Sequence, residues 1–353
     1  MAFVVMMAWP STAVERDRFV LDRRPLRPTH DPWRAQGVLV EDERTGDGRI
    51  VPVATLFLTG RECPWRCAMC DLWQHTTAED TPAGAIPAQI AAACRAIGGD
   101  VRQIKLYNAG SFFDPRAVPE ADYASIAALL GRFERVIVES HPSLIGPRLD
   151  RFLGLLGADR DAAAARDANR TTSAPPVLEV AMGLETAHPV ALERLHKRMT
   201  LDDFAAAASE LRALGVRLRV FLLIGPPFVP PDEQDPWLLR SLDAALASGA
   251  SVISLIPTRP GNGAIEALAA ERLFRAPTLD DIERSADIAL AHVAGRARLF
   301  VDLWEIERFA GADDNLFWRK ARLHAMNLRQ QPLPRVPDAR GNAESPRQPG
   351  LTP

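Results

Sequence analysis

Three cysteines stand close together in the segment Arg61-Glu62-Cys63-Pro64-Trp65-Arg66-Cys67-Ala68-Met69-Cys70. Their C-x3-C-x2-C spacing places three thiolates on one short loop. A structural zinc site takes four protein ligands, and ferredoxin-type clusters take four thiolates. A set of three leaves one metal position for an exchangeable ligand. We therefore expect a metal centre that binds and activates another molecule, and catalysis is the leading hypothesis.

Two other interpretations of these cysteines remain open. His75 follows Cys70 by five residues and could complete a Cys3His zinc site, although C-x3-C-x2-C-x4-H lacks the usual paired-knuckle layout. A disulfide is the weaker alternative. The remaining cysteine, Cys94, lies in an alanine-rich segment that we predict to be helical, where a buried inert thiol is expected.

The pattern along the chain predicts alternating strands and helices. The predicted strands are Ala54 to Leu58, Gln103 to Tyr107, Val136 to Glu139, Leu178 to Met182, Leu218 to Ile224 and Ser251 to Ile256. The predicted helices are Pro87 to Ile97, Ala121 to Phe133, Leu201 to Leu214, Trp237 to Ser248 and Leu279 to Val293. Thr200 and Thr278 each precede an acid by three positions, a spacing that predicts a capping box.

Such alternation indicates an α/β fold with a parallel sheet and helices packed outside. Six units suit a partial (β/α)6 TIM-like barrel, although a full barrel or an open doubly wound sheet is also compatible with the pattern. Arg298 to Trp304 is a candidate seventh strand. In barrels the chemistry lies at the carboxyl ends of the strands. The cysteine loop follows the first predicted strand, as this rule requires.

Further motifs follow the other predicted strands. They are KLYNAGSFFD from Lys105, VESHP from Val138, EVAMGLET from Glu179, HKRMT from His196 and GPPF from Gly225. Together with the CAMC of the cysteine loop, they resemble the radical S-adenosylmethionine (SAM) family between about Val53 and Gly263. The resemblance is to the subgroup that contains the Elongator catalytic subunit and, more closely, the radical SAM subunit of archaeosine synthase. It implies the partial barrel with an N-terminal wrap and a C-terminal extension.

The resemblance also implies two cofactors, a 4Fe-4S cluster and SAM, and a reaction that begins with reductive cleavage of SAM to a 5'-deoxyadenosyl radical. Cys63, Cys67 and Cys70 would bind the cluster. The family has a Gly-Gly-Glu-like turn after the second strand, where this chain carries Ala109-Gly110-Ser111 and lacks the carboxylate. The implied SAM-binding residues are Met69, Asn108, Ala109, Gly110, Ser111, Glu139, Ser140, Glu185, Arg198, Ile224 and Pro257.

Alternatives remain for some of these residues. Met69 could be an ordinary core methionine. Glu139 and Glu185, each at the end of an apolar strand, could instead form a structural ion pair with an arginine. His75, Thr258, Arg259 and Asn262 are candidate substrate contacts because they follow strand ends or the cysteine loop.

Composition indicates one main globular domain, because 353 residues with 47% hydrophobic and 25% charged can bury a full core. We divide the chain into an N-terminal extension (1-45), a core barrel (46-300), a docking segment rich in aromatic residues (301-330) and a disordered tail (331-353). Residues 157-176 are expected to form a flexible insertion. The first residues are apolar but too few for a membrane span and lack a basic leader. Because an oxygen-sensitive cluster needs a reducing compartment, we expect a cytoplasmic protein that does not bind membranes.

The preferred substrate is a modified nucleoside in tRNA, because the nearest resemblance acts there. A net charge of -3 neither establishes nor excludes RNA binding. The alternatives are tailoring of a small molecule or peptide, and a non-catalytic iron-sulfur or zinc protein that acts as a scaffold or sensor. A reductant such as flavodoxin or ferredoxin is the implied protein partner.

Overall fold

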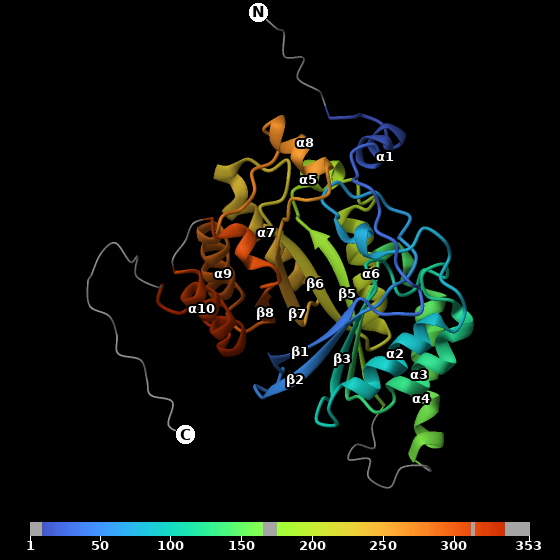
Figure 1. The fold of residues 1–353 in the computed structure, drawn as a ribbon. Helices are drawn as coiled ribbons and strands as arrows, with labels where there is room; N and C mark the ends of the chain where they lie inside the picture. Colours follow the sequence, from blue (N-terminus) through green and yellow to red (C-terminus); the bar gives the residue numbers. More distant parts are fainter. Residues whose placement is uncertain (1–8, 165–174, 312–314, 336–353) are drawn as a thin grey trace, which may run out of the picture.

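A computed structural model describes residues 9-164, 175-311 and 315-335 (Figure 1). Its centre is an eight-stranded sheet whose strand order follows the chain from β1 to β8. The strands are β1 (Gly37–Arg44), β2 (Ile50–Phe57), β3 (Gln103–Tyr107), β4 (Arg135–Glu139), β5 (Val177–Glu185), β6 (Arg217–Ile224), β7 (Val252–Pro257) and β8 (Arg298–Val301). β1 runs antiparallel to β2, and β2 to β8 are mutually parallel.

This order confirms the predicted α/β barrel. A doubly wound sheet reverses its strand order at a switch point, whereas here each strand pairs with its neighbour in sequence. The sheet curls into a nearly closed barrel, and β1 and β8 are its two edges. The candidate seventh strand of the parallel series is present as β8.

The helices are α1 (Ala13–Leu21), α2 (Ala85–Ala96), α3 (Tyr123–Leu130), α4 (Pro147–Ala164), α5 (Pro189–Arg194), α6 (Leu201–Ala213), α7 (Gln234–Ala247), α8 (Ala264–Ala270), α9 (Leu279–Val293) and α10 (Leu316–Arg329). Most helices flank the outer side of the barrel, whereas α1, α5 and α8 lie at the carboxyl-terminal end of the strands (Figure 1). Both predicted capping boxes form, with Thr200 and Thr278 accepting from the N3 amides of α6 and α9. Within the described residues, no helix is long and apolar enough to cross a membrane.

Apolar side chains join the strands to these helices in one large cluster. β3 and β4 contribute Ile104, Leu106, Val136 and Val138, all fully buried, and α2 contributes Ile86 and Ile90. Near α3 and α4 the rings of Phe112, Phe113, Tyr123 and Phe152 pack together, with centroids between 4.8 and 6.3 Å apart. Burial of aromatic and branched side chains of this kind is the main favourable term in folding.

Buried charges fill the amino-terminal half of the barrel interior. Glu43 of β1 pairs with Lys105 of β3, and Arg219 of β6 lies 3.3 Å from Glu43 and 2.7 Å from Glu179 of β5. Arg135 donates to Glu179 over 2.8 Å. Buried ions are tolerated only when paired in this way, and the amino-terminal end of a barrel lies away from the loops that carry its chemistry. We assign the network to the scaffold.

Side-chain amides at the carboxyl-terminal end of α10, from Asn327 and the C-cap residue Gln330, cover the free edge of β8. Asn327 accepts from the amide of Val301 over 2.8 Å and donates to its carbonyl over 2.9 Å. Gln330 does the same for Leu299, at 2.6 and 2.8 Å. The two amides therefore replace the backbone groups of a missing strand, which protects an edge that would otherwise pair with another chain.

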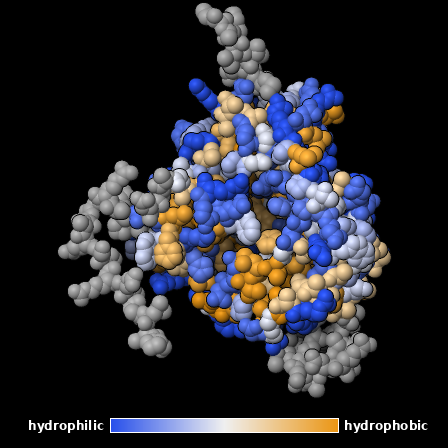
Figure 2. Space-filling model, in the orientation of Figure 1, coloured by the Kyte–Doolittle hydropathy of each residue, from blue (hydrophilic) through white to orange (hydrophobic). Residues whose placement is uncertain are grey.

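Three sequence expectations need correction. β1 was not predicted, because its outward Val38 and Val40 are 40% and 45% exposed and the strand ends in a charged run. Figure 2 shows apolar colour on the face that β1 and β2 present.

The first part of the insertion expected at 157-176 is helical, since α4 continues to Ala164; residues 165-174 lie outside the described part of the chain. Of the aromatic residues in the docking segment, Phe309 is buried in the core, whereas Phe317 and Trp318 are 71% and 60% exposed, and α10 packs through Leu323 and Met326 instead.

We predict that Asn327→Ala destabilises the fold. The variant leaves both backbone groups of Val301 without their partner, which should lower the free energy of unfolding by about 1 to 3 kcal/mol in urea titrations. His324→Ala, on an exposed face of the same helix, is the control and should change stability by less than about 0.5 kcal/mol. Equal effects of the two substitutions would contradict the edge-pairing role.

Candidate metal and cofactor site

The loops after the parallel strands meet at the carboxyl-terminal end of the barrel. The cysteine loop follows β2, and the loops after β3, β4, β5 and β7 supply its neighbours. Hydrogen bonds tie these segments together. Asn262, after β7, donates to the carbonyls of Ala68 and Cys70 over 2.8 and 3.2 Å, and the amide of Ala68 donates to Leu195 over 2.9 Å. The loop thus has a defined conformation without regular secondary structure.

Glu62, one residue before Cys63, is buried and surrounded by arginines. Arg24 lies 2.7 Å and Arg66 3.1 Å from its carboxylate, and Arg27 forms a third ion pair. Arg27 also donates to the carbonyl of Trp73 over 3.0 Å. The N-terminal segment therefore covers the cysteine loop, which gives the predicted wrap a specific contact.

A stacked pair of rings connects the cysteine loop to the segment that follows β4. The indole of Trp65 and the imidazole of His141 are parallel within 11°, with centroids 3.8 Å apart. Nε2 of His141 lies 2.9 Å from the carbonyl of Lys197, Nδ1 lies 2.8 Å from the hydroxyl of Ser143, and its backbone amide donates to Ser111 over 2.8 Å. Burial and the nearby Lys197 lower the pKa of His141 to about 4, so the ring is neutral at pH 7.

The three thiols are partly buried and interact electrostatically. Burial raises the pKa of Cys67 to about 12 even though the Lys197 ammonium lowers it. Burial, Cys63 and Cys67 all raise the pKa of Cys70. Within the described ranges, no three His, Cys, Asp or Glu side chains converge on a single-ion position, and His75 is exposed. A cubane cluster binds its thiolates through different iron atoms, so its ligands need not converge on one point.

Lys197 is the buried cation beside the cysteine loop. Its Nζ lies 2.5 Å from Oε1 of Glu185. Burial lowers the pKa of Lys197, but Glu185 and Cys67 more than offset this and the net shift is upward. Both side-chain ends pass over Gly183, where a Cβ would collide with them. The bulge between Gly183 and Glu185 creates this arrangement.

Polar groups after β3 and β4 form the opposite side of the site. Asn108 is fully buried, and neither atom of its side-chain amide has a hydrogen-bond partner among the described residues. Its backbone amide donates to Glu139 over 3.2 Å. Burial raises the pKa of Glu139 to about 8, although the amides of Asn108 and Ala109 and the charge of Lys197 lower it. Gly110 lies against Cys63, since a Cβ there would be 3.5 Å from the Cβ of that cysteine.

Backbone strain gathers at this end of the barrel. Ala109, Glu185, His196, Arg198 and Phe228 all have positive φ between 54° and 67°, a region unfavourable for residues with a side chain. They lie at the end of β5 and in the loops after β3, α5 and β6. Such residues persist where function constrains the backbone, and their clustering supports a ligand site here.

The other predicted residues have mixed surroundings. Arg198 is exposed and pairs with Asp17 of α1 over 2.5 Å, so it does not face the cysteines. Arg259 pairs with Asp302 over 2.6 Å, and the buried hydroxyl of Thr258 has no partner in the described structure. The side-chain amide of Asn262 donates to carbonyls of the cysteine loop. Met69, Ser140, Ile224 and Pro257 are buried or half-buried at the same end of the barrel.

Sequence reasoning missed the residues that hold the loop. Trp65 and His141 appeared in the motifs, but their contact depends on the pairing of distant segments. Asp17 binds His196 and Arg198 together, at 2.9 and 2.5 Å. No local pattern signals either contact.

The residues present fit the two groups that the family resemblance implies. Three thiols share one anchored loop, Lys197 supplies positive charge beside them, and Asn108 offers an unpaired buried amide to a polar ligand. Gly110 also brings its backbone next to Cys63, within reach of a ligand bound at the cysteines.

Comparison with known proteins gives two curated relatives, while no protein-family model matches the chain. Archaeosine synthase subunit beta of Methanosarcina acetivorans is 27% identical over 236 residues, which is 64% of this chain and 63% of that protein. An uncharacterized protein of Methanocaldococcus jannaschii is 23% identical over 253 residues, 68% of this chain and 64% of that protein. The chain thus spans less than two thirds of the length of either relative. The first match confirms the resemblance found from the motifs.

Solved structures with a similar fold have low identity. Coproporphyrinogen III oxidase from Escherichia coli, described as a radical SAM enzyme, gives a TM-score of 0.42 at 14% identity and covers 67% of this chain and 51% of its own. The archaeal Elp3 of Methanocaldococcus infernus, with an N-terminal deletion, gives 0.42 at 11% identity over 59% of this chain and 49% of its own.

The Trp65–His141 stack predicts the reactivity of the neighbouring thiols. In the metal-free protein, Trp65→Ala should let the cysteine loop open more often. Alkylation of Cys67 by iodoacetamide should become about 2- to 10-fold faster, which corresponds to the free energy contributed by one aromatic pair. Peptide mass spectrometry would follow Cys67 and use Cys94 as the internal reference. Trp304→Ala, at an exposed tryptophan, is the control. An unchanged rate at Cys67, or an equal rise at Cys94, would contradict the role of the stack.

Glu139 predicts a pH dependence of stability. Its pKa rises from 4.5 to about 8 in the folded protein, so the folded state binds the extra proton between these values and loses stability as pH rises through this window. Glu139→Gln should remove that loss, at most about 1.4 kcal/mol per pH unit. Urea unfolding at pH 5 and pH 8 would measure it, with the exposed Glu210→Gln as control. If the free energy of unfolding of Glu139→Gln fell with pH as steeply as that of the wild type, the raised pKa of Glu139 would be refuted.

Proposed function

We propose that the chain is a radical SAM enzyme that modifies a nucleoside in tRNA. The observation that carries this proposal is the set of three thiols on one anchored loop at the mouth of the barrel. They lie beside a buried lysine and an unpaired buried amide. The match to a relative named archaeosine synthase subunit beta supports the substrate class, because the resemblance found from the motifs implies a nucleoside in tRNA.

Cys63, Cys67 and Cys70 would hold the 4Fe-4S cluster. When bound and reduced, for example by flavodoxin or ferredoxin, the cluster supplies the electron that cleaves SAM to a 5'-deoxyadenosyl radical. Deprotonating three buried thiols is costly because burial raises their pKa values. Lys197 lowers this cost by placing a positive charge beside Cys67. We assign Lys197 the role of balancing the negative charge at the site.

Asn108 and Glu139 would bind the polar end of SAM. The amide of Asn108 has both donor and acceptor capacity unused in the described structure. With a pKa of about 8, Glu139 is largely protonated at pH 7 and can donate as well as accept a hydrogen bond. The pair therefore offers neutral recognition in place of the carboxylate that the family motif carries after the second strand. Glu185, which is bound to Lys197, would position that cation.

Reductive cleavage of SAM tests the proposal. The protein is reconstituted anaerobically with iron and sulfide, reduced with dithionite and given SAM, and 5'-deoxyadenosine is quantified. Wild type and Cys94→Ala should form product, whereas Cys67→Ala should form none because it loses a cluster ligand. Addition of bulk tRNA should raise the yield, and nuclease-digested tRNA should not.

Each other outcome has a distinct meaning. Product that tRNA never changes would reject the RNA substrate and favour tailoring of a small molecule or peptide. No product from a fully assembled cluster would favour the scaffold or sensor alternative. Zinc in place of iron in the purified protein, retained through the anaerobic reconstitution, would indicate a structural site.

A further inference from the structure

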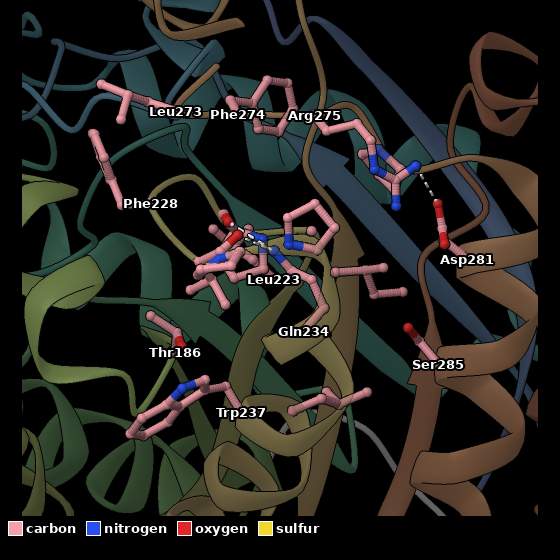
Figure 3. A pocket seen from close by; sticks show the side chains of 18 of the residues that line it. Thr186, Leu223, Phe228, Gln234, Trp237, Leu273, Phe274, Arg275, Asp281 and Ser285 are labelled. Carbon is pink, nitrogen blue, oxygen red and sulfur yellow. Dashed lines mark hydrogen bonds and ion pairs between the residues drawn. The ribbon is translucent and has the colours of Figure 1, made fainter. Parts of the chain in front are cut away.

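A pocket of about 440 Å³ lies beside the cysteine loop at the end of β6. Leu223, the loop 225-231, the first half of α7, the segment 272-277 and the start of α9 line it (Figure 3). Among the residues to which the sequence analysis gave a role in binding SAM or substrate, Ile224 lines this pocket and the others do not. None of the three cysteines lines the pocket, so the pocket is distinct from the site around the cysteines.

The pocket shares a wall with the cysteine loop. Leu223, Phe228 and Phe274 line it and also pack in one buried cluster with Ala68, which lies between Cys67 and Cys70. Met69 packs against the same cluster. A ligand in the pocket would thus touch side chains that support the loop.

The lining combines apolar surface with an excess of arginine. Arg194, Arg272, Arg275 and Arg284 line the pocket together with Asp281 as the lone carboxylate of the lining. Arg275 and Arg284 both pair with Asp281, at 3.0 and 2.7 Å. Within the described ranges Arg194 and Arg272 have no carboxylate partner, and Arg194 lies 5.8 Å from the centroid of Phe228. Two guanidinium groups are therefore available for an anion beside the apolar part of the lining.

The rim has a defined shape. Gln234 donates from Nε2 to the carbonyls of Pro226 and Val229, over 3.3 and 2.8 Å, which holds the loop after β6 (Figure 3). Phe228 has φ of 67° and Arg272 has φ of 59°, two strained residues on facing segments of the rim, and the amide of Phe228 bonds to Leu273 over 2.8 Å. Strain held in this way is common at ligand sites.

We propose that this pocket binds a nucleotide, with the base against the apolar wall and the phosphate at Arg194 and Arg272. Arginine is the preferred side chain for phosphate, and the volume lies in the range of small-molecule sites. The proposal rests on the proposed function insofar as the nucleotide belongs to the RNA substrate, and it then marks a second contact of that RNA next to the reaction site. A free mononucleotide has the same chemistry and is the other possible source.

Binding measurements on the full chain test this pocket separately from catalysis. The probes are an unmodified tRNA transcript and adenosine 5'-monophosphate, titrated at fixed ionic strength because phosphate binding depends on salt. Arg272→Glu should weaken binding at least about 10-fold, an amount expected for a charge-assisted phosphate contact. Ser285→Leu, which fills the pocket from α9 without changing charge, should weaken it as well. Arg212→Glu, an exposed arginine of α6 with the same charge change, is the matched control.

Loss of tRNA binding alone would place the nucleotide within an RNA, and loss of monophosphate binding would show that a free nucleotide suffices; either supports the proposal. Equal effects of Arg272→Glu and Arg212→Glu, no effect of Ser285→Leu, or no binding of either probe would overturn it. Thermal unfolding would confirm that the variants are folded. Cleavage of SAM without RNA reports the proposed function independently, so failure of the pocket and failure of the enzyme assignment are distinguishable.

Discussion

The burial of Glu62 is the constraint on which the functional end of the barrel depends. A carboxylate removed from water one residue before Cys63 must be neutralised, and Arg24, Arg27 and Arg66 do this together. Two of these arginines come from the N-terminal segment. The ion cluster therefore fixes the start of the cysteine loop and holds the N-terminal segment over it. A loop that lacks helix and strand hydrogen bonds obtains its order from these contacts.

Buried polar groups are paired at the amino-terminal end of the barrel, whereas some are left unpaired at the carboxyl-terminal end. At the amino-terminal end, Glu43 and Glu179 are each bound by two or more cations, and the pKa of each is held below its usual value despite burial. At the carboxyl-terminal end, the pKa of Glu139 is raised and the amide of Asn108 is unpaired. An unpaired buried polar group costs free energy, which a bound polar ligand can restore. The contrast separates the structural part of the interior from the functional part.

The sequence predicted the elements whose signals are local. The period-two and apolar runs located β2 to β8, and the threonine caps located the starts of α6 and α9. The cysteine spacing located the site. Elements that depend on contacts between distant segments were not predicted. β1 carries exposed valines and a charged end, so its sequence lacks the pattern of a buried strand. Asn327 and Gln330 bind the edge of β8, and nothing in the local sequence indicates that this edge lies beside them.

The cation beside the cysteines shows that residue type and position in a motif do not suffice to predict which side chain faces the site. The resemblance gave Arg198 a role in binding SAM, but His196 and Arg198, both with positive φ, contact Asp17. The residue between them, Lys197, consequently points the opposite way, to Glu185 and the thiols. If Asp17 were absent, Arg198 would lose its partner and could turn inward. The N-terminal helix therefore selects which of two adjacent cations serves the site, and it does so through a single carboxylate.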